Sequence, residues 1–171
     1  GIVIAAKTAE GLRVMNQKIR DRELKKYYLC IVHGTLPRPA GRLEGYILKD
    51  EAKKQVTVSS RPKPGAKTAV TLYETLAVRN GLSLVRCQLI TGRTHQIRAQ
   101  FAAAGHPLLG DGKYGSERQN KRYGRSYQAL YSYRLEFCFT TDAGALAPLD
   151  GQRFQVEQVD FVTEYFPGFS L

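Results

Sequence analysis

The sequence is poor in the residues that a disulfide framework or a zinc site would need. It has three cysteines, Cys30, Cys87 and Cys138, which are widely spaced and form no C-x-x-C pair. Isolated thiols in strand-like runs are typical of buried, free cysteines in a reducing compartment. The sequence also shows no signal peptide and no apolar run long enough to cross a membrane. We therefore expect a cytoplasmic protein with no zinc site.

Acidic residues are also scarce. Against 26 Lys and Arg stand only 15 Asp and Glu, which gives a formal net charge of +11. Such an excess favours a polyanionic partner, most often nucleic acid, although a basic protein without a particular partner is the alternative. A membrane surface is disfavoured because no basic amphipathic helix with an aromatic face is present. The 171 residues, 43% of them hydrophobic, suffice for one globular domain.

Several common catalytic signatures are absent. His95 and His106 are eleven residues apart, which matches no usual zinc motif, so hydrogen-bonded structural histidines are favoured. No G-x-S-x-G elbow exists, and no cysteine is placed beside a histidine for nucleophilic catalysis. The G-D-G-K-Y-G run at 110–115 lacks the G-K-[ST] ending of a phosphate-binding loop. We therefore expect no metal ion and no nucleotide-binding P-loop.

Hydrophobic periodicity predicts more strands than helices. Strands are expected at residues 1–6, 27–33, 41–48, 55–60, 68–79, 82–90 and 128–140, and helices at 8–20 and from 93–95 to Gly105. Asn80-Gly81 is a strong signal for a two-residue hairpin, and the stretches 61–67 and 116–127 are expected to be loops. Aromatic residues in the tail are expected to cover the core. The predicted class is α+β, with a mixed, mostly antiparallel sheet and a few flanking helices.

The stretch 89–115 organises the rest of the chain. Its helix begins with a polar and basic cluster, Arg93, His95, Gln96, Arg98 and Gln100, and then becomes small and apolar. Arg98 shares a helix face with Thr94 and Phe101 and can therefore point inward. A buried arginine needs an anionic partner. Residue types alone leave two possibilities open: a core salt bridge with Asp111 or a glutamate, and a bound phosphate or carboxylate.

Two basic stretches, 61–67 and 113–125, are candidates for contacts with RNA. Tyrosines are interleaved with the second stretch, at Tyr114, Tyr123 and Tyr127, and can stack on bases while the cations bind phosphates. Solvated loops are the plainer alternative. The candidate RNA-binding residues are Arg61, Lys63, Lys67, Lys113, Arg118, Lys121, Arg122 and Arg125.

Four stretches together resemble the RluA-type pseudouridine synthases. They are L-I-T-G-R-T-H-Q-I-R at 89–98, G-H-P-L-L-G-D-x-x-Y-G at 105–115, K-x-Y-L-x-x-V-x-G at 26–34 and A-V-T-L-Y-E at 69–74. The resemblance runs through about residue 142 and fades over the tail. It implies isomerisation of uridine to its C-glycoside in structured ribosomal or transfer RNA, without cofactor or metal. The expected enzyme is a monomer, and the target nucleotide is expected to leave its RNA helix.

The resemblance also implies roles for individual residues. Arg98 matches the arginine that pairs with the family's catalytic aspartate, and Tyr28 matches the tyrosine that stacks on the base and serves in proton transfer. Leu130 matches an apolar pocket residue, and Arg93, His95 and Gln96 are expected to line the substrate pocket. The sequence departs from the family at 130–132, where L-Y-S stands in place of the frequent L-H-[AS].

The family's catalytic segment, H-R-L-D, is not found in the sequence. Residues 1–8 resemble the strand that follows this segment, and none of the six aspartates lies in such a motif. We therefore expect residues 1–171 to form one catalytic domain that is incomplete at its N-terminus and inactive alone. The alternatives are a non-catalytic RNA-binding module of the same fold and, less favoured, a basic ribosome-associated structural protein.

Overall fold

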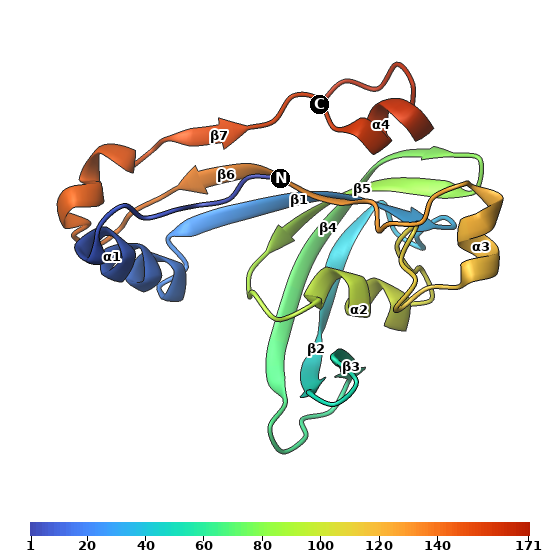
Figure 1. The fold of residues 1–171 in the computed structure, drawn as a ribbon, viewed down its shortest axis with the longest axis horizontal. Coiled ribbons are helices and arrows are strands. Elements are labelled where there is room, and N and C mark those ends of the chain that lie inside the picture. Colours follow the sequence, from blue (N-terminus) through green and yellow to red (C-terminus); the bar gives the residue numbers. More distant parts are fainter.

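The computed structural model describes all 171 residues and is built on one sheet of seven strands (Figure 1). The strands are β1 Leu24–His33, β2 Ala40–Asp50, β3 Gln55–Ser59, β4 Lys67–Arg79, β5 Leu82–Leu89, β6 Leu130–Phe137 and β7 Arg153–Gln155. Their order across the sheet is β3-β2-β4-β5-β1-β6-β7, and every neighbouring pair is antiparallel. The predicted α+β class with a mostly antiparallel sheet is confirmed.

Four α-helices and one 3-10 helix accompany the sheet. They are α1 Ala9–Arg20, α2 Gln96–Ala103, α3 Glu117–Arg122, α4 Asp160–Tyr165 and the 3-10 helix η1 Gly144–Leu149. The Thr8 hydroxyl accepts the backbone N–H of Gly11 at 3.0 Å and so caps α1, as its sequence predicts. After α2, Gly105 has a φ of +85°, the left-handed conformation that commonly ends a helix.

The hairpin that joins β4 to β5 follows directly from its two turn residues. Asn80 and Gly81 have φ values of +50° and +74°, and two consecutive positive φ angles are what a type I′ turn requires. The turn brings Arg79 opposite Leu82 at the start of the β4–β5 ladder. The hairpin predicted from Asn80-Gly81 is therefore confirmed.

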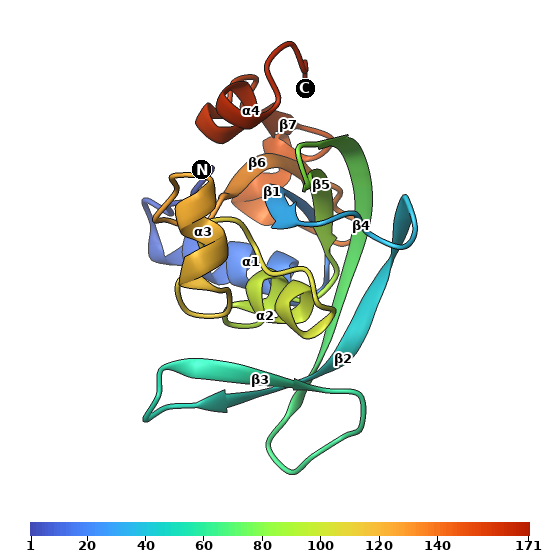
Figure 2. The ribbon, with the colours of Figure 1, turned by 90° about the vertical axis from the view of Figure 1, so that its right-hand side faces the viewer.

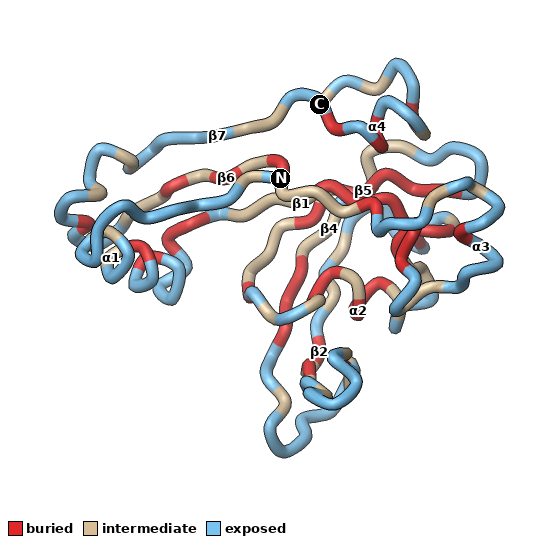
Figure 3. The backbone as a smooth tube through the Cα atoms, in the orientation of Figure 1, coloured by how far each residue is buried: buried red, intermediate tan, exposed pale blue.

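The two faces of the sheet are covered by different elements. On one face, Ile97 and Phe101 of α2 pack against β1 and β5 residues such as Cys30 and Val85. On the opposite face, the C-terminal segment packs Phe161 and neighbouring apolar residues against Leu29, Ile31 and Leu84. Buried residues accordingly gather where β1, β5 and α2 meet (Figure 3). The prediction that the aromatic tail covers the core is confirmed.

Strands β2 and β3 and the beginning of β4 extend away from the rest of the sheet (Figures 1 and 2). We call this extension, residues 45–68, the arm. Its base is fixed to α2, because Ala99 packs in one buried cluster with Ile47, Val56 and Ala69. The loop 61–67 lies at its far end and is almost entirely exposed (Figure 3). The arm therefore presents basic residues to solvent beside α2.

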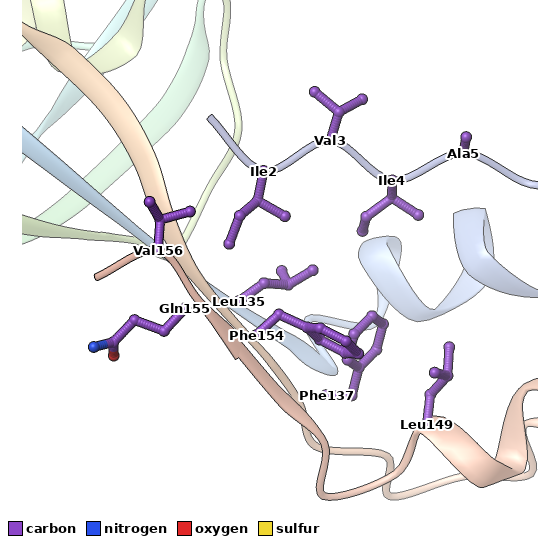
Figure 4. A pocket seen from close by; sticks show the side chains of 10 residues that line it. All are labelled: Ile2, Val3, Ile4, Ala5, Leu135, Phe137, Leu149, Phe154, Gln155 and Val156. Atoms are coloured by element: carbon purple, nitrogen blue, oxygen red, sulfur yellow. The ribbon is translucent and has the colours of Figure 1, made fainter. Parts of the chain in front are cut away.

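The prediction of a buried strand at residues 1–6 is wrong. The segment runs along β6 but makes one backbone hydrogen bond to it, from Ile2 N–H to the carbonyl of Ser132 at 2.8 Å. Because β6 already pairs with β1 on one edge and β7 on the other, it has few backbone groups left for a further strand. Ile2 and Ile4 face an apolar hollow of about 410 Å³, while Val3 points away and is 86% exposed (Figure 4).

Two other local expectations need correction. The stretch 116–127, predicted as a loop, contains α3, whose acidic first residue and basic last residues suit the helix dipole. Cys30 and Cys87 are fully buried, with 3.8 Å between their sulfur atoms, but Cys138 lies just beyond β6 and is only half-buried. The prediction of buried free thiols therefore holds for two of the three cysteines.

A fully buried ion pair joins α1 to the segment that follows β6. Lys18 is 1% exposed, and its ammonium donates to Glu23 Oε2, to the Thr141 carbonyl and to the Thr141 hydroxyl, each at 2.7 Å. Glu23 Oε1 accepts the hydroxyls of Thr140 and Thr141 at 2.8 Å. The hydrogen bond from Lys18 is the main cause that lowers the pKa of Glu23 from 4.5 to about 2, against the opposing effect of burial.

This pair predicts acid sensitivity. Since the pKa of Glu23 is lower in the folded chain, its stabilising contribution is complete above pH 4.5 and is lost as pH falls towards about 2. We expect the Glu23→Gln variant to unfold at a lower temperature than the wild type at pH 7 and to show a smaller further loss between pH 5 and pH 2.5. Thermal unfolding followed by circular dichroism measures both, with the exposed Glu117→Gln as control. Parallel pH profiles for wild type and Glu23→Gln would contradict this assignment.

Candidate functional site

The turn that leads into α2 is held to the sheet by the buried amide of Gln96. Its Oε1 accepts the Thr91 hydroxyl at 2.8 Å and the backbone N–H of Arg93 at 3.0 Å. Its Nε2 donates to the Val70 carbonyl at 3.0 Å and to the Thr71 hydroxyl at 2.9 Å. Gln96 is 2% exposed, so this residue, predicted to line the substrate pocket, has no polar group free for a ligand.

Gln100, one turn further along α2, makes the same kind of contact. Its Oε1 accepts the Thr71 hydroxyl at 2.7 Å, and its Nε2 donates to the carbonyls of Ala69 and Leu43 at 3.1 and 3.2 Å. Buried amides with all partners satisfied fix relative positions strongly, because any shift leaves a buried polar group unpaired. The two glutamines are four residues apart and so share one helix face, a spacing that could have indicated their common role.

Arg98 points inward, as its helix position predicts, and its partner is Asp111. Nε donates to Oδ2 at 2.7 Å and Nη2 donates to Oδ1 at 2.8 Å, a bidentate pair with side-chain exposures of 13% and 0%. Asp111 Oδ1 also accepts the backbone N–H groups of Lys113 and Tyr114 at 2.9 and 3.1 Å. Of the two possibilities that the sequence leaves open, the core salt bridge is therefore present in the structure.

The pair is ionised over a wide pH range. Burial by itself would raise the pKa of Asp111, but the hydrogen bonds from Arg98 and from the two backbone N–H groups outweigh it and lower that pKa. The hydrogen bond to Asp111 raises the pKa of Arg98. A guanidinium has five N–H groups, and Asp111 accepts only two of them. The remaining donors of Arg98 have no acceptor within the protein and are available to a ligand.

Tyr114 links this pair to the arm. Its ring lies 5.1 Å from the guanidinium carbon of Arg98. Its hydroxyl accepts the backbone N–H of Val56 in β3 at 2.9 Å and forms a 2.9 Å hydrogen bond with Nδ1 of His95. Burial and the nearby charges of Arg98 and Lys113 lower the pKa of His95. His95 is therefore neutral near pH 7 and serves to hold the turn before α2 against the arm.

Tyr28 and Leu130 lie on the sheet face that α2 covers. Tyr28 is opposite Cys87 of β5 and Ser132 of β6 and is half-buried. Tyr28 and Leu130 both pack against the apolar cluster that contains Ile97 of α2. The structure thus gathers these two predicted site residues beside the helix that carries Arg98.

Arg93 lies on the other side of the same turn, towards the arm. Its Nε donates to the Thr68 carbonyl at 2.9 Å. Together with Lys49, Lys67 and Thr94 it lines a hollow of about 190 Å³ between the arm and α2. Arg93 is therefore placed to contact a ligand that lies along the arm.

Most of the candidate RNA-binding residues are exposed. Those with free access to solvent are Arg61, Lys63, Lys67, Lys113, Arg118, Lys121 and Arg122. Arg125 differs, because its side chain is only 17% exposed and lies over the Phe161 ring, where it pairs with Glu164 at 3.2 Å and donates to the Tyr127 carbonyl at 3.0 Å. The charge of Arg125 is thus already used to attach α4, which the sequence did not indicate.

No group of three or more His, Cys, Asp and Glu side chains is arranged to hold a metal ion. Both histidines that were considered as ligands have other partners: His95 bonds to Tyr114, and Nδ1 of His106 lies 2.9 Å from the carbonyl oxygen of His33. None of the helices has both the length and the apolar character needed to cross a membrane.

Comparison with known sequences identifies a family. The profile of the family described as RNA pseudouridylate synthase matches residues 1–103. An uncharacterised RNA pseudouridine synthase of Mycoplasma genitalium is 37% identical over 142 residues, which cover 80% of this chain and 43% of that protein. The ribosomal large subunit pseudouridine synthase C of Escherichia coli is 32% identical over 146 residues, which cover 82% of this chain and 44% of that protein.

Solved structures show the same fold. The human RNA pseudouridylate synthase domain containing 4 superposes with a TM-score of 0.68 at 21% identity, covering 90% of this chain and 65% of that chain. The human domain containing 1 gives a TM-score of 0.66 at 19% identity, covering 93% and 72%. The chain spans less than half the length of the two sequence relatives described above.

Proposed function

Because the chain belongs to the RNA pseudouridylate synthase family, we propose that it supplies the catalytic face of an enzyme that isomerises uridine in structured RNA. The observation that carries the proposal is that the family match includes both Tyr28 and Arg98, which lie in β1 and in the helix packed against it. The proposed substrate is ribosomal or transfer RNA in the cytoplasm, and the proposed active form is a monomer.

The reaction needs positioning and proton transfer more than it needs a cofactor. The N1–C1′ bond of uridine breaks, the uracil turns, and a C5–C1′ bond forms; C5 then loses a proton and N1 gains one, so atoms and charge balance. The base must first leave its helix to be reached. In this proposal Tyr28 stacks on the extruded base and takes part in the proton transfer, Leu130 packs against it, and the free donors of Arg98 hold the reacting groups in place.

In this proposal the exposed cations provide the main contacts with the RNA backbone. Arg61, Lys63 and Lys67 extend along the end of the arm, while Lys113, Arg118, Lys121 and Arg122 lie in and around α3. The two groups come from distant parts of the sequence and project from different parts of the fold (Figure 1). An RNA helix that contacts both would bring a nucleotide to the face between them.

Phosphate contacts of this kind predict that RNA affinity falls steeply as the salt concentration rises. If four to six of these cations contact phosphates, the slope of log K against log salt is expected to be about −3 to −5, because each neutralised phosphate releases counterions. Fluorescence anisotropy of a labelled stem-loop RNA between 50 and 300 mM KCl measures the slope. An affinity that does not change with salt would contradict this electrostatic account.

The proposed activity is tested by measuring pseudouridine, the product of the reaction. The natural gene product that contains these 171 residues is incubated with a structured RNA transcript, and the RNA is digested to nucleosides. Chromatography is expected to show pseudouridine formed in equal amount to the uridine lost. The 171-residue chain alone, assayed in parallel, is expected to bind the RNA without forming product.

A second candidate function is RNA binding without catalysis, and the Arg98–Asp111 pair is the observation that favours it. A buried arginine with no internal partner would imply a missing anionic ligand. Here the bidentate contact with Asp111 gives Arg98 a structural reason to be buried. Tight RNA binding by the natural gene product, with no pseudouridine formed, would select this alternative.

A further inference from the structure

Lys26 is a half-buried cation that has no partner in the protein. It lies in β1 opposite Leu89 of β5, two residues before Tyr28, so both side chains project from the face that α2 covers. Its ammonium forms no salt bridge, and burial, with no opposing hydrogen bond or charge partner, lowers its pKa. Lys26 begins the K-x-Y stretch that carries part of the family resemblance, and no internal contact explains its charge.

The surroundings of the Lys26 ammonium are suited to an anion. A carbon added to Cα of Gly92 would lie 3.4 Å from Nζ, so the ammonium rests against the turn between β5 and α2. The backbone N–H groups of Gly92 and Thr94 in this turn have no acceptor within the protein. None of the eight salt bridges of the protein, which include every ammonium–carboxylate pair within 4.0 Å, involves Lys26. The Lys26 ammonium therefore lies against an exposed turn and has no anionic partner within the protein.

We propose that Lys26 binds a phosphate of the RNA backbone beside the nucleotide whose base contacts Tyr28. The identity of the anion rests on the proposed function. Residues two apart on a strand are separated by about 7 Å, which is within the length of one nucleotide. An ammonium is a compact point charge that suits a phosphate oxygen, and this is the role that lysine commonly has in phosphate binding.

The contrast with Lys18 supports a role in binding. Lys18 is buried for structural reasons, and its ammonium makes three hydrogen bonds within the protein. Lys26 has none, and a partly desolvated charge without a partner destabilises the fold. Groups that reduce stability in this way are found mainly at functional sites. Replacing Lys26 should therefore weaken RNA binding without weakening the fold.

The test compares two adjacent lysines. Lys25 precedes Lys26 in β1 and is exposed on the opposite face of the sheet. Lys25→Met therefore removes the same charge from the face that lies away from the proposed phosphate site. For Lys26→Met we expect about a tenfold loss of affinity for a stem-loop RNA and a slope of log K against log salt that is shallower by about 0.7 to 0.9, the value for one phosphate. Its melting temperature should equal or exceed that of the wild type, and Lys26→Arg should retain most of the affinity.

The outcomes are distinct. Unchanged affinity and slope in Lys26→Met, or an equal loss in Lys25→Met, would overturn the proposal, and so would a clear fall in the melting temperature of Lys26→Met. Pseudouridine formation by the natural gene product, measured on the same RNA, separates the two hypotheses. If pseudouridine forms and the RNA affinity does not depend on Lys26, only the proposed phosphate site is ruled out. If the affinity depends on Lys26 and no pseudouridine forms, only the proposed activity is ruled out. Absence of any RNA binding contradicts both.

Discussion

The natural gene product with Arg98 replaced by alanine is expected to isomerise uridine at least about 100-fold more slowly, the effect typical of removing one positioned donor from an active site. RNA affinity should change little, because in this proposal the exposed cations of the arm and α3 make most of the phosphate contacts, whereas Arg98 is only 13% exposed. Single-turnover tritium release from 5-tritiated uridine in RNA, at saturating enzyme, measures the chemical step, and anisotropy measures binding.

Two further variants distinguish a role of Arg98 in the reaction from a role in RNA binding. Arg98→Lys keeps the charge but cannot form the bidentate contact with Asp111, so it should also be slow. Arg118→Ala removes an exposed cation of α3. It should weaken RNA binding and leave unchanged the rate at which bound RNA is converted to product. If Arg98→Ala lost affinity but converted bound RNA at the wild-type rate, Arg98 would be an RNA contact and its assignment to the reaction would be wrong.

The second large effect is on stability. Asp111→Ala leaves the Arg98 guanidinium buried without its partner and removes the acceptor of two backbone N–H groups. Breaking a buried ion pair from one side costs about 3–5 kcal/mol. For a domain of this size, a loss of that amount lowers the melting temperature by roughly 2–4 °C for each kcal/mol. Chemical unfolding in urea measures the change directly.

Three further variants test whether the stability lost in Asp111→Ala comes from the broken ion pair. The Asp111→Asn variant keeps one acceptor oxygen and should lose less stability than Asp111→Ala. The double variant Arg98→Met with Asp111→Leu removes both charges and should recover much of the loss, because apolar side chains can replace a buried pair. Asp142→Ala, an exposed aspartate, is the control and should cost less than about 1 kcal/mol. A stable Asp111→Ala protein would show that the pair contributes little.

The sheet was largely predictable because its signals are local. Alternating apolar residues and the Asn80-Gly81 turn specify the strands and one hairpin without reference to the rest of the chain. Residues 1–6 were mispredicted because a strand needs a free edge as well as apolar residues, and β6 already has two neighbours. Which edges are free depends on the whole topology, which no short window of sequence contains.

The site was predictable in part for the same reason. Helix periodicity indicates that Arg98 points inward, and residue types name Asp111 as one possible partner among several anions. Only the tertiary fold selects it, because Asp111 belongs to a loop that lies outside the helix. Gln96 was expected in the pocket as part of the polar cluster in the stretch that resembles the family; its burial depends on groups of β4, which the local sequence does not reveal. Lys26 is the first residue of the K-x-Y stretch that carries part of the family resemblance, but only the structure shows that it lacks a partner.

The central claim is that this fold acts on uridine and does more than bind RNA. The most direct measurement is tritium release from RNA labelled at C5 of uridine by the natural gene product, followed together with the fraction of RNA bound. We expect release that requires Arg98 and reaches one tritium for each target uridine. Saturated binding of the RNA with no release of tritium would contradict the claim and leave an RNA-binding protein.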